Sequence, residues 1–199
     1  MSGMFYGCEN LLNLDINSFK LENVKDISGM FQGCHSIEEI ILPKSKTINL
    51  DKMDNLFSSC SSLKNLNLNF LNTSRVSSMN QVFYGCINLE KIDGIQLDVK
   101  NVVDMSGMFQ KCSSLVNLNL SSFNSSKLEN IDYMFSECTN LQSLNLENFN
   151  TLNCNSFTNT FNDCKNLEVT LNPKYCNNLY SYIPDYVKVK NITSNIDNF

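Results

Sequence analysis

The stretch Asp104 to Leu120, DMSGMFQKCSSLVNLNL, contains a Phe-x-x-Cys core that returns along the chain at a constant spacing. Each copy begins 26 residues after the previous one, as from Phe83 to Phe109. A fixed period of about 20 to 50 residues indicates a stacked repeat architecture, because one unit cannot bury its own apolar face. The seven copies start at Phe5, Phe31, Phe57, Phe83, Phe109, Phe135 and Phe161.

Each copy is expected to contain a short strand and a short helix. Leu115, Leu118 and Leu120 form an L-x-x-L-x-L pattern whose second half alternates with period two, which predicts a strand with one buried face. Met108 and Phe109 share with Leu115 one face of a 3.6-residue helix, so the recurring Phe and Met side chains are expected in the core. The expected fold is an α/β solenoid of about seven 26-residue coils, with a parallel sheet on one face and short helices on the other.

The repeats are expected to occupy residues 1–172, with a C-terminal cap and tail in residues 173–199. Three coils depart from the pattern. Pro43 should end its strand because it cannot donate a ladder hydrogen bond, and Gly94 loosens the next departing strand or marks a bulge. The coil after Cys164 is one residue short and is followed by Pro173, where the repeat ends. The cap segment is richer in Tyr and Lys, and its apolar members are placed to fold over the last coil. They are Tyr180, Tyr182, Ile183, Tyr186 and Val187.

The chain opens inside a repeat, since Met1 stands four residues before Phe5 as Met105 stands before Phe109. Terminal repeats of a solenoid need a polar cap. We therefore expect either a fragment of a longer chain or self-association through the uncapped first coil. No signal peptide pattern is present at the start.

Composition argues against several functional classes. A net charge of −5 and a pI near 4.9 weigh against nucleic-acid binding, which needs a basic stripe. No apolar run approaches the roughly 20 residues of a transmembrane segment. We see no nucleophile elbow, Gly-rich phosphate loop or paired-carboxylate motif, and we expect neither catalysis nor a cofactor. Cys34 and His35 are adjacent, but neighbours on a helix point in different directions, so we expect an exposed loop histidine.

Seven of the nine cysteines occupy the ladder position and two, Cys154 and Cys176, do not. Side chains stacked in parallel are further apart than the ~3.8 Å between Cβ atoms that a disulfide prefers. We favour free, buried thiols, with a thiolate metal ladder as the alternative, which lacks CxxC spacing and clustered His. Cys154 replaces Val or Leu and is expected in the core, which leaves Cys176 as the only plausible reactive thiol.

The outward face of the sheet is the candidate ligand face. Its side chains alternate with the buried leucines, and an extended face of amides and charges suits a protein or glycan partner. The simpler interpretation is that these residues only keep the sheet soluble. The face consists of Asn13, Asp15, Glu39, Ile41, Asn65, Asn67, Lys91, Asp93, Asn117, Asn119, Ser143 and Asn145.

The repeat resembles that of the BspA-like leucine-rich-repeat surface proteins, the bacterial surface protein 26-residue repeat. The family unit reads D-M-S-x-M-F-x-x-C-x-x-L-x-x-L-D-L-S-x-W, and Asp104 to Phe123 is similar to it, with Phe123 where the family often has Trp and Asn119 where it often has Asp. The resemblance covers residues 1–172. It implies a leucine-rich-repeat solenoid and an extracellular or cell-surface location in adhesion, with no catalytic residues to carry over.

The expected function is therefore a non-enzymatic cell-surface module that binds protein or glycan, in adhesion or host interaction. The alternative is a structural spacer or stalk of a larger surface protein whose binding parts lie elsewhere. The two hypotheses differ in whether substitutions along the outward face change binding to a partner.

Overall fold

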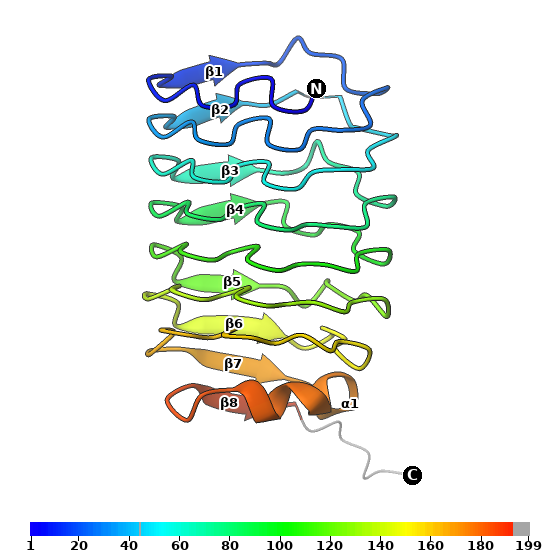
Figure 1. Ribbon diagram of the computed structural model, residues 1–199, viewed down its shortest axis with the longest axis vertical. Helices are drawn as coiled ribbons and strands as arrows, with labels where there is room; N and C mark the ends of the chain where they lie inside the picture. The colour runs from blue at the N-terminus through cyan, green and yellow to red at the C-terminus, as the bar shows by residue number, and fades with distance from the viewer. Residues whose placement is uncertain (44, 193–199) are drawn as a thin grey trace.

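The computed structural model describes residues 1–43 and 45–192; Lys44 and residues 193–199, the end of the expected cap and tail, lie outside the described residues. The chain winds as a solenoid whose coils stack along the long axis, with the N-terminus at one end (Figure 1). We number the coils 1 to 7 by their Phe-x-x-Cys copies. The expected solenoid with parallel strands on one face is confirmed.

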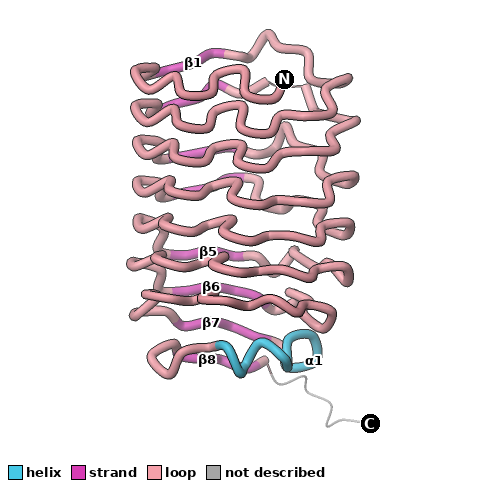
Figure 2. Tube along the Cα trace, in the orientation of Figure 1, coloured by secondary structure: helices cyan, strands magenta, loops and turns pink. Residues whose placement is uncertain are grey.

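One strand from each coil lines the same side of the stack (Figure 2). Neighbouring strands pair in parallel and in register, as with Leu118 opposite Leu144. The alternating pattern determines this geometry: Leu118 is buried while Asn117 and Asn119 on either side of it are exposed. The strands are β1 (Asn13–Asp15), β2 (Glu39–Ile41), β3 (Asn65–Asn67), β4 (Lys91–Asp93), β5 (Asn117–Asn119), β6 (Ser143–Leu146) and β7 (Glu168–Leu171).

The strands form three sheets rather than one continuous sheet. β1 pairs with β2, β3 with β4, and β5 with β6, β7 and the cap strand β8 (Lys188–Asn191). The breaks follow coils 2 and 4, the two departing coils that contain Pro43 and Gly94. β2 ends two residues before Pro43, which lacks an N–H and restricts the residue before it. Gly94 has a φ of 71°, which turns the chain out of the extended path directly after β4.

The side opposite the strands consists of consecutive turns, so the expected short helices are wrong for residues 1–43 and 45–172. In coil 5, the N–H groups of Met108, Gln110 and Cys112 each donate to the carbonyl three residues earlier, at 3.0 to 3.2 Å. The alternate N–H groups donate instead to the next coil; Gly107, for example, bonds the carbonyl of Asp132 at 2.8 Å. A helix would direct every N–H along its own chain. Here half of them join one coil to the next.

Two positions per coil require a left-handed backbone, which explains why turns replace helix. In coil 5 they are Gly107 and Lys111, with φ of 60° and 65°. A turn whose third residue has positive φ has the form of a type II turn. An α-helix requires negative φ at every residue, so it excludes this conformation. The same two positions are left-handed in all seven coils: Gly3, Gly29, Asn55, Gln81, Gly107, Tyr133 and Asn159, and then Gly7, Gly33, Ser59, Gly85, Lys111, Glu137 and Asp163.

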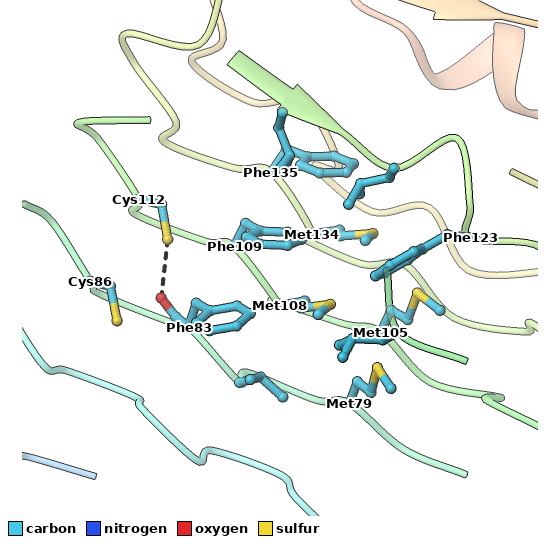
Figure 3. Packing of buried hydrophobic residues seen from close by; sticks show 14 of the residues in the cluster. Met79, Phe83, Cys86, Met105, Met108, Phe109, Cys112, Phe123, Met134 and Phe135 are labelled. Atoms are coloured by element: carbon cyan, nitrogen blue, oxygen red, sulfur yellow. Dashed lines mark hydrogen bonds between the residues drawn. The ribbon is translucent and has the colours of Figure 1, made fainter. Parts of the chain in front are cut away.

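The core is a set of ladders that run along the stack (Figure 3). The rings of Phe83 and Phe109 stack with centroids 5.3 Å apart, and Phe109 and Phe135 follow at 5.9 Å. The Cys112 thiol donates to the carbonyl oxygen of Phe83 at 3.1 Å. The thiols of Cys34, Cys60, Cys86, Cys138 and Cys164 each reach the equivalent Phe carbonyl of the preceding coil.

The C-terminal end of coil 7 is covered by α1 (Pro173–Cys176), the 3-10 helix η1 (Asn177–Tyr182) and β8. Asn172 caps α1 by accepting a hydrogen bond from the N–H of Lys174 at 3.1 Å, and Pro173 suits the first helical position. Leu179 and Val187 are buried against the last coil. The ring of Tyr182 stacks on Phe157 at 4.6 Å.

Candidate functional site

The structure places the twelve candidate residues in two rows along the exposed side of the strands. The first row lies five residues after each Cys and consists of Asn13, Glu39, Asn65, Lys91, Asn117 and Ser143. The second row lies seven residues after each Cys and consists of Asp15, Ile41, Asn67, Asp93, Asn119 and Asn145. Every member of both rows is exposed except Asn145, which is half-buried.

The second row has a structural role that sequence analysis missed. The Oδ1 atom of Asn67 accepts the N–H of Asn69 at 2.9 Å, and Asn119 does the same for Ser121 at 3.0 Å. Asp15 and Asn145 make the equivalent bonds. These Asx turns bend the chain as it leaves each strand. The sequence signal for these turns was the Asp or Asn seven residues after the Cys, which makes the turn in four of the six coils: Asp15, Asn67, Asn119 and Asn145. Much of the polarity in this row therefore serves the fold.

The first row is different because its side chains make few contacts within the protein. In the described part of the chain, the side chains of Asn13, Glu39, Asn65, Asn117 and Ser143 make no hydrogen bond or ion pair. Lys91 pairs with Asp93 at 3.0 Å, but both side chains are more than half exposed, and such pairs contribute little to stability. This row presents carbonyl, amide, carboxylate and hydroxyl groups directly to solvent.

The face is hollowed where the sheet is broken between β2 and β3. One hollow of about 440 Å³ is lined by Asn13, Glu38, Glu39, Ile40, Lys64, Asn65, Leu66, Asn67 and Asp93. Five of these belong to the candidate face, so the structure brings part of the predicted site together. The other seven candidates do not line it: Asp15, Ile41, Lys91, Asn117, Asn119, Ser143 and Asn145.

A second hollow of about 460 Å³ adjoins the first and shares Ile40 and Asn67 with it. Its remaining lining residues are Leu42, Pro43, Lys46, Asn69 and Phe70. None of these five was predicted, although Pro43 was the sequence signal for a break at this place. Ile41, the odd apolar member of the face, is 47% exposed beside this region. Together the hollows combine apolar floor residues with amide and charged groups at the rim, as ligand sites commonly do.

The cysteines are all free thiols, and eight of the nine are buried. The expectation that Cys176 is the reactive thiol is wrong, because its side chain is buried in the cap and donates to the carbonyl of Asn172 at 3.0 Å. Burial raises the pKa of the Cys176 thiol to about 11. Cys8 is the exposed cysteine.

Cys34 and His35 do not form a catalytic pair. The Cys34 thiol points to the Phe5 carbonyl at 3.1 Å, whereas Nδ1 of His35 lies 2.9 Å from the carbonyl oxygen of Ser59. Burial raises the pKa of Cys34 to about 11, so its thiol is protonated at neutral pH. Among the described residues, no three His, Cys, Asp or Glu side chains are grouped to hold a metal ion. The helices of the described chain are all too short or too polar to cross a bilayer.

One family model and one solved structure are similar to this chain. The family model described as "Mycoplasma protein of unknown function, DUF285" matches residues 1–115, 51–174 and 88–199. The chain is also similar to a solved structure, a leucine rich cell surface protein from Faecalibacterium prausnitzii A2-165. Sequence identity is 12%, the match covers 98% of this chain and 76% of that one, and the TM-score is 0.38. A search of the curated proteins finds no match.

Proposed function

Because the chain belongs to the DUF285 family of Mycoplasma proteins, whose function is unknown, we propose a role from its own surface. The protein is a non-enzymatic, cell-surface leucine-rich-repeat module that binds a protein or glycan through the outward face of its parallel strands. The surface location and the role in adhesion follow from the resemblance of the repeat to that of BspA-like proteins.

One observation supports this function most directly: the first row is the part of the face that the fold does not use. Asn65 and Asn117 are exposed and make no hydrogen bond within the described chain, while Asn67 and Asn119 next to them are engaged in Asx turns. An amide without a partner in the fold can donate and accept bonds to a ligand. Repeated along the axis, such groups give the extended recognition surface that solenoids offer.

The hollows between β2 and β3 support the same proposal, and we propose that binding is centred on them. The first hollow is lined in part by the first row, and the second adjoins it through Ile40 and Asn67. Their apolar floor, formed by residues such as Ile40 and Leu66, would be covered by a partner, and burial of apolar surface contributes about 25 cal/mol per Å². Coils 2 to 4 are therefore the centre of the proposed site.

The spacer function is the second candidate, and the Asx turns favour it. If the polar residues of the second row exist to bend the chain, the first row can equally exist to keep the strands soluble. The regular hydrogen bonds between coils would then serve only to add length.

A pair of charge-matched variants separates the two. In Asn65→Lys/Asn117→Lys, two long cations replace first-row amides, and no hydrogen bond of the fold is lost. The control Asn140→Lys/Asn166→Lys makes the same chemical change at exposed residues that precede β6 and β7 and do not belong to the candidate face. Both variants must first show the circular dichroism spectrum and unfolding midpoint of the parent.

Binding is then screened against purified extracellular-matrix proteins and an array of glycans. We expect at least one partner that the parent and the control retain and the face variant loses by tenfold or more (about 1.4 kcal/mol). A partner bound equally by all three proteins, or none at all, would favour the spacer.

A further inference from the structure

The turn side of coil 7 differs from the turn sides of the six coils before it. In each earlier coil, at least three alternate N–H groups donate to carbonyl oxygens of the following coil. In coil 6, Tyr133 donates to Thr158 at 2.8 Å and Phe135 to Thr160 at 3.0 Å. The equivalent donors of coil 7 are the N–H groups of Asn159 and Phe161. Within residues 1–43 and 45–192, neither has an acceptor.

The cap satisfies only part of what a following coil would supply. The hydroxyl of Tyr186 accepts the N–H of Asp163 at 3.1 Å and donates to the Phe161 carbonyl at 3.3 Å. These two bonds replace a next-coil carbonyl and a ladder thiol, such as the Cys164 thiol on the Phe135 carbonyl. The cap thus reaches one end of the turn segment, and the N–H groups of Asn159 and Phe161 beside it have no partner in the described part of the chain. Phe161 is itself only 1% exposed, and unpaired N–H groups at buried residues are rare.

Asn159 and Phe161 both line a hollow of about 360 Å³ between the turns of coil 7 and the cap. Its walls include the rings of Phe157, Tyr182 and Tyr186 and the ring of Pro184. Tyr182 and Tyr186 are 51% and 43% exposed. None of the lining residues is charged, which argues against an ionic ligand held by side chains.

We propose that this hollow binds an extended polypeptide segment of a partner protein, through the N–H groups of Asn159 and Phe161 and the Tyr182 and Tyr186 rings. The ligand class follows from the repeat itself. In all six earlier coils, donors at these positions meet main-chain carbonyls two residues apart on a neighbouring segment. Aromatic-lined grooves are also a recurring way to recognise extended, proline-rich peptides. This site lies on the opposite side of the coil from the sheet face and does not depend on the function proposed above.

The test selects a random 12-residue peptide library, displayed on phage, against the immobilised full chain, and then measures binding of the enriched peptides as synthetic ligands. We expect Tyr182→Ala to weaken binding by about tenfold or more, because it removes one wall of the hollow. The matched control is Tyr133→Ala, an exposed tyrosine on the turn side of coil 6 that does not line the hollow. It should change the affinity by less than about twofold.

Amide exchange of the parent chain gives a readout that needs no variant. Bound peptide should slow hydrogen exchange at the N–H groups of Asn159 and Phe161, and Asn159→Gly should keep binding because it removes the side chain and retains the donor. No enriched peptide, peptides indifferent to Tyr182→Ala, or unchanged exchange at both amides would overturn the proposal. Binding of a neutral glycan that needs the Asn159 side chain and displaces the peptide would also overturn it.

Discussion

At the scale of single residues, the ladder cysteine connects two coils as well as filling the core. The carbonyl of Phe83 accepts both the N–H of Cys86, within its own turn, and the thiol of Cys112 from the next coil, each at 3.1 Å. A thiol is a small apolar group with a weak donor. It therefore gives the second lone pair of a buried carbonyl a partner without the desolvation cost of a hydroxyl.

Thiol chemistry should reflect this burial. With an aromatic disulfide reagent at pH 8, we expect one of the nine thiols, Cys8, to react rapidly in the native chain and all nine to react in denaturant. Burial raises the pKa of Cys154 and Cys176 to about 11, so at pH 8 few native molecules carry the reactive thiolate at either site. A second fast thiol in the native state would contradict the buried ladder, and Cys8→Ser should abolish the fast phase.

The left-handed positions make a separate prediction. Ser59 has a φ of 61°, at a position that is Gly in coils 1, 2 and 4, and a non-Gly residue there costs about 1 kcal/mol. Ser59→Gly should raise the free energy of unfolding by up to about 1 kcal/mol, measured by urea denaturation. The matched control Ser62→Gly, which is not left-handed, should lower it by roughly 0.5–1 kcal/mol. If both changes destabilise equally, the turn geometry is incorrect.

At the scale of elements, the strands could be predicted from sequence and the turn side could not. Period-two alternation in residues such as Leu118 and Leu120 has one simple structural solution, a half-buried strand. The spacing of Met108, Phe109 and Leu115 fits a helix, but it also fits three consecutive turns that bury the same side chains. Gly107 and the glycines at its equivalents were the signal that decides between them, because recurring glycine two residues before Phe favours a left-handed turn.

Packing within this element is tested by truncating one ring of the ladder. Phe109 is fully buried between Phe83 and Phe135, so Phe109→Ala should cost about 3–5 kcal/mol of unfolding free energy. Val116→Ala in the same coil is the control: Val116 is 40% exposed, and its truncation should cost less than about 0.5 kcal/mol. If equilibrium denaturation shows that Phe109→Ala lowers the free energy of unfolding by less than about 1 kcal/mol, Phe109 is not part of the core.

At the scale of the whole molecule, the two sides of the solenoid differ in how continuously their coils are hydrogen-bonded. The turn side is bonded from coil to coil throughout, whereas the strand side is broken after β2 and after β4. The candidate face was predictable as a row pattern, since it follows from alternation. The hollows could not be predicted. They result from the loss of strand pairing between neighbouring coils at Pro43, and the sequence of one coil does not show how the next coil packs against it.

The central claim is that the sheet face binds a partner, with its centre at coils 2 to 4. The most direct measurement uses a partner found in the binding screen and determines its Kd for four single variants of the first row. They are Asn13→Lys, Asn65→Lys, Asn117→Lys and Ser143→Lys. We predict a loss of tenfold or more at Asn65, a smaller loss at Asn13 and Asn117, each two coils away, and an unchanged Kd at Ser143, three coils away. A Kd that none of the four changes would contradict the claim and favour the spacer.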